Sequence, residues 1–363
     1  MNYYSFNKSI MGQCICFLPE NSQTQQATGA TAGATTCAGA TASIEMQPDI
    51  TRVALKFPHG VNGAHFSRFK EKFINCNINE WLADLYKGSL WTHWVAYNDE
   101  IPDLEKTNED THDNKHTAGH CKGIVAWNAS RLSWLCHSVP KFPSKFNGNF
   151  ISIIEESETI YGQSFHYTEV ALSEKVTAVK VLKQLLIMHA NVYLTSPNLP
   201  SNKLVPMILL LSPVGATTLE VNNGFGTMFL TPDIFHIAKP PKLHLDIYEE
   251  LAKLATLDVK TKSKWYIETW IRGHHLEKND QQMSTCLDIT ELQLNSVSWK
   301  SSQDHSKWAV SGQGKKFYFM GDLNRMSSQL SRGGGGMLCE DEQLANALFA
   351  MIRGWDGLKH IET

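Results

Sequence analysis

The stretch DHSKWAVS, residues 304–311, places a histidine and a lysine two positions apart at the start of a segment rich in aromatic and β-branched residues. Such residues favour a β-strand, in which positions i and i+2 point to the same side. The imidazole of His305 and the ammonium of Lys307 would therefore stand together on one face. A solvated edge strand would explain this pair, and so would a site that binds an anion and acts on it.

The chain contains a second His-x-Lys tripeptide of this kind in HCKGIVAW, residues 120–127, formed by His120 and Lys122. In each copy the tripeptide starts an apolar strand, and a turn leads to a second strand. A polar residue ends each unit, His137 in the first and Asn324 in the second. This weak internal repeat predicts two similar halves that each supply half of one site.

Two His-x-Lys pairs suit the cleavage of a phosphodiester bond. One imidazole can attack phosphorus while the other protonates the leaving oxygen. Two ammonium groups can hold the non-bridging oxygens, with no metal ion or other cofactor needed. The reaction needs one neutral and one protonated imidazole, and nearby lysines lower the pKa of both, so we expect activity to peak below neutral pH.

The composition is that of an ordinary soluble globular protein, with 363 residues, 42% hydrophobic and 19% charged. A net charge of −3 gives no overall basic field, so binding to a polyanion would need a local patch. No apolar run is long enough to predict a transmembrane helix, and the N-terminus makes a poor signal peptide.

We expect three parts along the chain: a disordered Ala/Thr/Gly-rich leader over 1–49, an N-terminal half over 50–215 and a C-terminal half over 216–363. The apolar stretch LVPMILLLSPV, residues 204–214, is interpreted as a buried strand, and Ser173 as the N-cap of a helix. Further strands are predicted over 51–58, 90–99, 120–127, 132–139, 264–271, 307–311 and 315–322, and helices over 173–189, 246–257 and 341–355.

Several stretches in this order closely resemble deoxyribonuclease II, a family of the phospholipase D superfamily. They are HCKGIVAW, WLCHSVPKFP, YGQSF (161–165), DHSKWAVS, GDLNR (321–325) and RGGGG (332–336). The resemblance covers roughly residues 51–355. It implies an α/β (α+β) class and a phospholipase D-like fold, with two pseudo-symmetric halves that each have a β-sheet flanked by helices.

The resemblance also implies metal-independent, acid-favoured endonucleolytic cleavage of DNA that leaves 3′-phosphate ends. Carried over by motif, His120 would attack phosphorus and form a phosphohistidine. His305 would protonate the departing 5′ oxygen and later activate water. Lys122 and Lys307 would clamp the phosphate, and Asn324 would hydrogen-bond a non-bridging oxygen. The internal repeat leaves the roles of the two histidines interchangeable.

Two further residues are candidates for substrate binding. His137 occupies the place in the first half that Asn324 occupies in the second. Gln163, in YGQSF, could line the cleft or cap a turn. RGGGG could be a flexible loop, or its amides could form an anion-binding nest.

The expected partner is DNA, bound through its backbone without sequence preference. Relatives form homodimers, so a homodimeric clamp is possible, and no membrane partner is expected. Members of the family are typically lysosomal or secreted, whereas this sequence leaves the compartment open.

Three competing interpretations remain. His112, His116 and His120 are spaced four apart, which on a helix would form a metal-binding face, although the polar loop around them does not favour a helix. The chain could also be a phospholipase D-type enzyme acting on another substrate. Finally, it could be an inactive DNA-binding relative, which would have little need for two paired titrating groups.

Overall fold

The computed structural model describes residues 49–56, 58, 66–67, 90–102, 118–146, 149–151, 156–200, 203–212, 224–254, 263–271, 276, 284–294, 297–312 and 316–356. These residues belong to one unit, Asp49–Thr363. The predicted leader lies outside the described residues except for Asp49, so its expected disorder stays a prediction.

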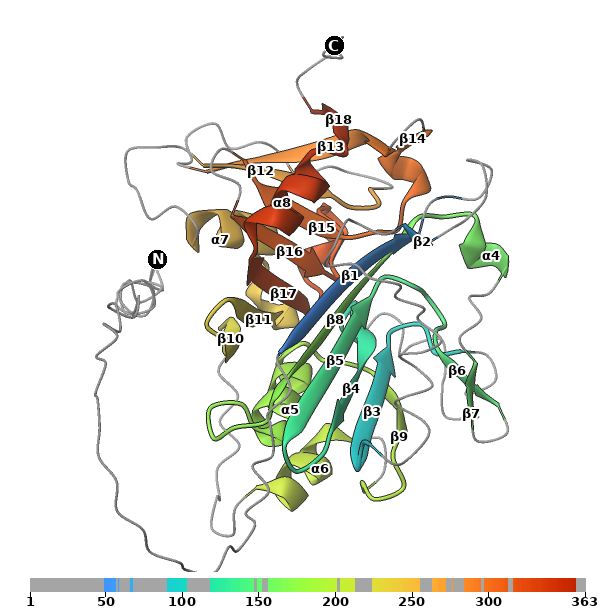
Figure 1. Cartoon of the computed structure of the whole chain (residues 1–363), viewed down its shortest axis with the longest axis vertical. Helices are drawn as coiled ribbons and strands as arrows, with labels where there is room; N and C mark the ends of the chain where they lie inside the picture. The colour runs from blue at the N-terminus through green and yellow to red at the C-terminus, as the bar shows by residue number, and fades with distance from the viewer. Residues whose placement is uncertain are drawn as a thin grey trace, which may run out of the picture. The chain divides into compact units, whose positions relative to one another are not determined.

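A seven-stranded sheet forms from the first part of the chain, with the order β2-β1-β8-β5-β4-β3-β9 (Figure 1). All of its neighbours pair antiparallel. The predicted turn between the strands over 120–127 and 132–139 is confirmed, since β4 and β5 pair directly and are buried along almost their whole length. The strands are β1 (Ile50–Lys56), β2 (Phe66–Ser67), β3 (His93–Asn98), β4 (Lys122–Trp127), β5 (Arg131–His137), β8 (Gln163–Ala171) and β9 (Val192–Thr195).

A second, nine-stranded sheet has the order β10-β11-β17-β16-β15-β12-β13-β14, and β18 pairs with β13. Its pairs are antiparallel except for β12 with β13. The strands are β10 (Gly226–Thr231), β11 (Ile234–Lys239), β12 (Ser263–Glu268), β13 (Ser284–Leu294), β14 (Val297–Lys300), β15 (Trp308–Ser311), β16 (Phe317–Gly321), β17 (Gly334–Glu340) and β18 (Ile352–Trp355). A small separate hairpin joins β6 (Ser144–Phe146) to β7 (Asn149–Ile151).

The two large sheets share one order of strands. The run β1-β8-β5-β4-β3 in the first sheet corresponds to β11-β17-β16-β15-β12 in the second. In both runs the first strand comes earliest in the chain, and the other four appear across the sheet in the reverse of their chain order. The strand that follows each His-x-Lys histidine, β4 or β15, occupies the same place. The predicted boundary at 215/216 falls between the two sheets, in a segment outside the described residues.

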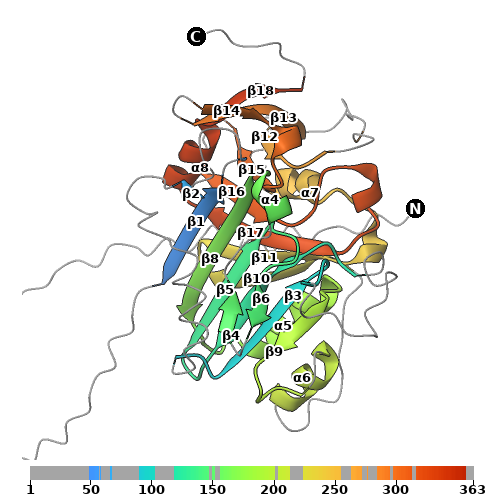
Figure 2. The same cartoon turned by 90° about the vertical axis from the view of Figure 1, so that its right-hand side faces the viewer.

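The sheets pack against each other through β5 and β8 on one side and β11 and β16 on the other (Figure 2). Trp134 stacks on His236 with ring centroids 4.1 Å apart. The Nε2 atom of His166 lies 3.2 Å from the hydroxyl oxygen of Tyr318. One hydrophobic cluster runs through both sheets, so burial of apolar area holds them together. Mixed helices and sheets agree with the predicted α/β (α+β) class.

The described helices are short: α4 (Glu156–Thr159), α5 (Ala178–Ile187), α6 (Leu204–Leu211), α7 (Ile247–Leu254) and α8 (Glu342–Phe349). The prediction that Ser173 caps the helix of 173–189 is wrong. The cap is Thr177, whose hydroxyl accepts a hydrogen bond from the backbone N–H of Lys180 at 3.3 Å. Among the described residues, no helix is long and apolar enough to cross a membrane.

The strand predicted over 204–214 is also wrong, because residues Leu204–Leu211 form helix α6. Pro206 lies in the first turn, where a backbone N–H has no partner within the helix, and leucine is a good helix former. Leu209 and Leu210 are 55% and 59% exposed, which a buried strand would not allow. The helix predicted over 341–355 ends at Phe349, and its last part forms β18, which pairs with β13.

Candidate active site

The fold places the two His-x-Lys histidines against opposite sheets. His120 precedes β4, and its backbone N–H donates to the carbonyl oxygen of Gly333, just before β17, at 2.8 Å. His305 follows the short 3-10 helix η3 (Ser301–Gln303), and its N–H donates to the carbonyl oxygen of Gly162, just before β8, at 2.8 Å. Each histidine is therefore anchored to the equivalent strand of the other sheet.

The ring of His120 is held in one tautomer. Its Nδ1 atom lies 2.6 Å from the backbone carbonyl oxygen of Asp322, which can only accept, so Nδ1 carries the proton and Nε2 a lone pair. Burial holds the pKa of His120 well below its usual value, and the charges of Lys122, Lys307 and Arg332 lower it further, against the opposing charge of Asp99. His120 therefore presents a neutral ring with a lone pair on Nε2.

The ring of His305 is held by a carboxylate. Its Nδ1 atom lies 3.2 Å from Oε2 of Glu158 on α4. Its Nε2 atom is buried and has no hydrogen-bond partner in the described part of the chain. Burial lowers the pKa of His305, Lys307 lowers it as well, and the hydrogen bond that Glu158 accepts from the ring opposes both. A carboxylate at Nδ1 stabilises the protonated ring, and Nε2 can then donate to a bound group.

Two lysines and one arginine surround the site. Lys122 forms a buried ion pair with Asp99, whose other oxygen lies 3.1 Å from Nη2 of Arg332. Burial disfavours the ammonium of Lys122, but the carboxylates of Asp99, Glu100 and Asp322 together raise its pKa. Lys307 donates from Nζ to the carbonyl oxygen of His305 at 2.6 Å. Burial and the charge of Lys122 lower the pKa of Lys307 to about 8.

The carboxyl groups balance only part of this positive charge. Asp99 is buried, yet Lys122, His120 and Arg332 hold its pKa below its usual value. Burial raises the pKa of Asp322 to about 8, in spite of the nearby Lys122, so that below neutral pH this side chain is uncharged. Asp99 is then the charged carboxylate that forms ion pairs with Lys122 and Arg332, and a bound anion would offset part of the positive charge of Lys122, Lys307 and Arg332.

The structure places His137 and Asn324 as buried residues with unused hydrogen-bonding capacity. The Nδ1 atom of His137 accepts from the N–H of Val139 at 3.2 Å, so Nε2 carries the proton, and within the described residues it has no acceptor. Burial first, and then Lys122, lowers the pKa of His137 to about 3. The Oδ1 atom of Asn324 likewise has no partner in that part of the structure. His137 can therefore donate from Nε2 to a ligand that enters the site, and Asn324 can accept from one through Oδ1.

Gln163 is placed behind the site. Its amide oxygen accepts from the hydroxyl of Ser138 at 2.6 Å, and its Nε2 lies 3.4 Å from Oε2 of Glu158. Both ends of this fully buried side chain are thus engaged by protein groups. Gln163 supports Glu158, and its contact with substrate stays a prediction.

Sequence reasoning missed Asp99, Glu158 and Arg332. Asp99 directly follows β3, and Glu158 lies just before YGQSF. Their positions near the ends of strands are the feature by which the sequence could have indicated them. Arg332 opens RGGGG, whose glycines lie in or just before the buried strand β17, so this stretch is no flexible loop. A Cβ atom at Gly333 would meet the carbonyl oxygen of Met188 at 2.1 Å, which explains the glycine by close packing.

The histidine-rich metal face, considered as an alternative, cannot be placed, because His112 and His116 lie outside the described residues. Within the described ranges, no group of three or more His, Cys, Asp or Glu side chains is arranged to hold a metal ion.

Comparison with known proteins gives one family. The model of the family Deoxyribonuclease II matches residues 67–357. A Burkholderia thailandensis protein assigned as deoxyribonuclease-2 is 30% identical over 272 residues, which cover 71% of this chain and 70% of the relative. Cell-death-related nuclease 7 of Caenorhabditis elegans is 28% identical, covering 69% of this chain and 65% of the relative. Human deoxyribonuclease-2-beta is 27% identical, covering 74% and 71%.

Proposed function

The chain belongs to the deoxyribonuclease II family, and from that premise we propose that it is an endonuclease that hydrolyses DNA phosphodiesters to 3′-phosphate ends through two histidines, without a metal ion. The observation that carries the proposal is that the two histidine rings are held in the same way. Each has its Nδ1 bound by the opposite half of the chain, His120 by Asp322 and His305 by Glu158, which leaves Nε2 as the reacting atom of each ring. Within the described residues the buried Nε2 of His305 has no hydrogen-bond partner.

In the first step, Nε2 of His120 attacks phosphorus and the bond to the 5′ oxygen breaks. The proton on Nε2 of His305 passes to that oxygen, which leaves as a hydroxyl group. The ring of His120 becomes positively charged, and its Nδ1–H bond to the carbonyl oxygen of Asp322 stabilises that charge. The DNA is now joined through its 3′-phosphate to His120.

In the second step, the neutral His305 takes a proton from water, whose oxygen attacks phosphorus. The bond from phosphorus to Nε2 of His120 breaks, and a 3′-phosphate leaves. His120 is again neutral and His305 again protonated, so the cycle closes. Lys122, Lys307, the Nε2–H group of His137 and the side-chain NH2 group of Asn324 donate to the non-bridging oxygens.

The pKa directions support the division of roles and the acid preference. His120 has the more strongly lowered pKa and stays neutral in acid, as a nucleophile must. The pKa of His305 is also lowered, so this general acid is charged only in acid. The lysines lower the pKa of both histidine rings, as expected, although burial lowers it more.

The shared strand order supports a phospholipase D-like fold of two pseudo-symmetric halves. The substrate we propose is DNA, held through its backbone without base readout. A homodimer would provide a clamp around it.

Plasmid cleavage in excess EDTA tests the proposal, at pH 5 and pH 7.5, beside the His120→Ala, His305→Ala double variant. We expect nicking in EDTA that is faster at pH 5 and disappears in the double variant. Nicking that requires an added divalent metal would contradict the mechanism, and no nicking under any condition would contradict the enzymatic role.

A further inference from the structure

The two halves place different side chains around equivalent histidines. Arg332 directly precedes Gly333, the glycine that anchors His120, and Tyr161 directly precedes Gly162, the glycine that anchors His305. Arg332 and Tyr161 therefore occupy corresponding positions, one charged and one aromatic.

A second pair of positions differs in the same way. Asn98 of β3 pairs with Lys122, and Asp99 comes next. Glu268 of β12 pairs with Trp308. Continuing this antiparallel register by one residue places Thr269 opposite Lys307, and Trp270 follows Thr269 in the chain. Asp99 and Trp270 thus correspond.

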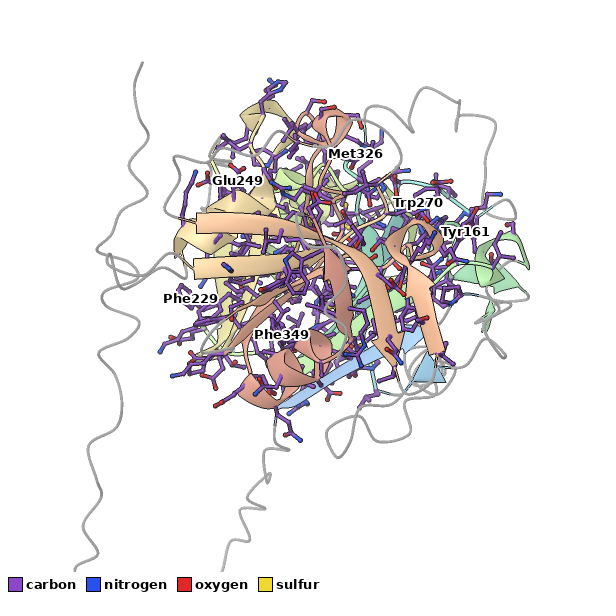
Figure 3. The ribbon with its side chains drawn as sticks, turned by 90° about the horizontal axis from the view of Figure 1, so that it is seen from above. Tyr161, Phe229, Glu249, Trp270, Met326 and Phe349 are labelled. Atoms are coloured by element: carbon purple, nitrogen blue, oxygen red, sulfur yellow. The ribbon has the colours of Figure 1, made fainter. Side chains whose placement is uncertain are left out.

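The result is two unlike flanks of one site. The pair Asp99 and Arg332 lies on the His120 side, joined by an ion pair of 3.1 Å. On the other side, Tyr161 stacks on the ring of His305 with centroids 4.1 Å apart and planes 11° apart. The ring centroid of Trp270 lies 3.9 Å from that of His305 and 5.6 Å from that of Tyr161. Figure 3 shows Tyr161 and Trp270 close together.

We propose that Tyr161 and Trp270 form a nucleobase subsite, which binds the base of the nucleotide that leaves with the 5′ hydroxyl. This inference rests on the proposed function, in which His305 protonates that hydroxyl. A base stacked on these rings would lie next to the nucleoside whose oxygen His305 serves.

Charge favours a base over a second phosphate on this flank. The carboxylate of Glu158 contacts His305, and the carboxylate of Asp304 lies one residue away, where it accepts from the indole of Trp299 at 2.7 Å. Lys122 and Arg332 lie on the other flank, whereas the ammonium of Lys307 donates to the carbonyl oxygen of His305 at 2.6 Å and is one of the groups that hold the cleaved phosphate. A phosphate would be repelled by the carboxylates, whereas a neutral base would not.

The two rings are also suited to any base. Both residues are half-buried, and each ring packs against that of His305. Every base has a π-face, so stacking on aromatic side chains adds affinity without sequence preference. This matches an enzyme that reads the DNA backbone.

The test uses single-stranded oligonucleotides with one abasic residue at a fixed position and the wild-type enzyme at pH 5. Cleavage rates are measured separately at the bond on the 5′ side of the abasic residue and at the bond on its 3′ side. Only at the 5′ bond does the abasic residue leave with the 5′ hydroxyl. We expect that bond to be cut about tenfold more slowly than in the intact oligonucleotide, and the 3′ bond to be cut at the normal rate.

The Trp270→Ala variant completes the comparison. It should cut the intact oligonucleotide more slowly and no longer distinguish the abasic one at the 5′ bond, whereas a ring that only packs against His305 would leave the abasic effect as in wild type. Equal cutting of both bonds by the wild type, or slowing at the 3′ bond, overturns the subsite and leaves the proposed function standing. An enzyme that cuts no oligonucleotide overturns both.

Discussion

The Nδ1 atom of His120 lies 2.6 Å from the backbone carbonyl oxygen of Asp322, a residue 202 positions later in the chain. The acceptor is a main-chain atom, so its position is set by the backbone between β16 and β17 and not by a side-chain rotamer. His305 differs, because its Nδ1 partner is the side chain of Glu158. The two histidines should therefore respond differently when their partner residues are substituted.

Asp322→Asn should leave cleavage at pH 5 within about threefold of wild type. The carbonyl acceptor remains, and the carboxyl group of Asp322, with its pKa raised to about 8, is already uncharged at that pH. An amide is close to it in shape and can still accept from the N–H of Lys122, 3.4 Å from Oδ1. Steady-state cleavage of a labelled oligonucleotide measures this, and a loss of a hundredfold or more would show that the side chain itself takes part.

Glu158→Gln should lower kcat about ten- to a hundredfold at pH 6, the size expected for weakened general acid catalysis. Glu158 raises the pKa of His305, so its removal lowers that pKa. The protonated ring is then lost at lower pH, and the alkaline limb of the pH–rate profile should move towards acid.

Glu174→Gln is the matched control for Glu158→Gln, because Glu174 is exposed on the surface. It should keep both the rate and the profile. If Glu158→Gln reduced the rate equally at every pH, Glu158 would serve only the architecture of the site.

Gly333→Ala should destabilise the protein by about 1 to 3 kcal/mol, the usual cost of overpacking. Its Cβ would lie 2.1 Å from the carbonyl oxygen of Met188, and the backbone must shift where Gly333 accepts from His120. Gly224→Ala is the control, since nothing lies within 4 Å of its added Cβ, and it should change the unfolding free energy by less than about 0.5 kcal/mol. Urea denaturation compares the two, and equal stabilities would contradict the packing at β17.

Stability should fall in the acid range where activity rises. Burial lowers the pKa of His137, His166 and His236 to about 3 each. In the unfolded chain they bind protons near pH 6.5, so the unfolded state holds more protons between pH 6.5 and 3. Their stabilisation is fully present above pH 6.5 and is lost as the pH falls towards 3.

The loss should amount to about 1 to 2 kcal/mol for each of these histidines between pH 7 and pH 5. Urea unfolding at the two pH values measures it. The His236→Leu variant should lose about 1 to 2 kcal/mol less unfolding free energy between pH 7 and pH 5 than wild type, whatever the effect of the substitution at pH 7. His244→Asn replaces an exposed histidine with left-handed φ by a residue that tolerates that region, and should leave the drop unchanged. An unchanged drop in His236→Leu would show that His236 is not buried in its neutral form.

The hydrophobic pattern was sufficient to predict the strands around each His-x-Lys pair. HCKGIVAW and the strand after it are buried and apolar on both faces, and this left little ambiguity. It failed at LVPMILLLSPV, because a short apolar run fits a helix as well as a buried strand, and only tertiary packing separates the two. It also could not separate the end of α8 from β18.

The candidate site was predictable where the chain repeats itself and not where the halves differ. Both His-x-Lys pairs could be found from spacing alone. Glu158 and Arg332 could not, because each acts on a histidine of the other half and the contact exists only after the sheets pack. The first half has the ion pair of Asp99 and Arg332 where the second half has the aromatic pair of Trp270 and Tyr161. This difference is visible only when the two sheets are aligned strand by strand.

The covalent intermediate on His120 is the most direct test of the central claim. A short oligonucleotide is mixed with enzyme in EDTA and quenched within the first turnover into alkaline denaturant, in which a phosphoramidate survives, and peptides are mapped by mass spectrometry. The account predicts a nucleotide 3′-phosphate joined to the peptide that carries His120 in wild type, and none in His120→Ala. An adduct on His305 instead, or cleavage with no adduct on either histidine, would contradict it.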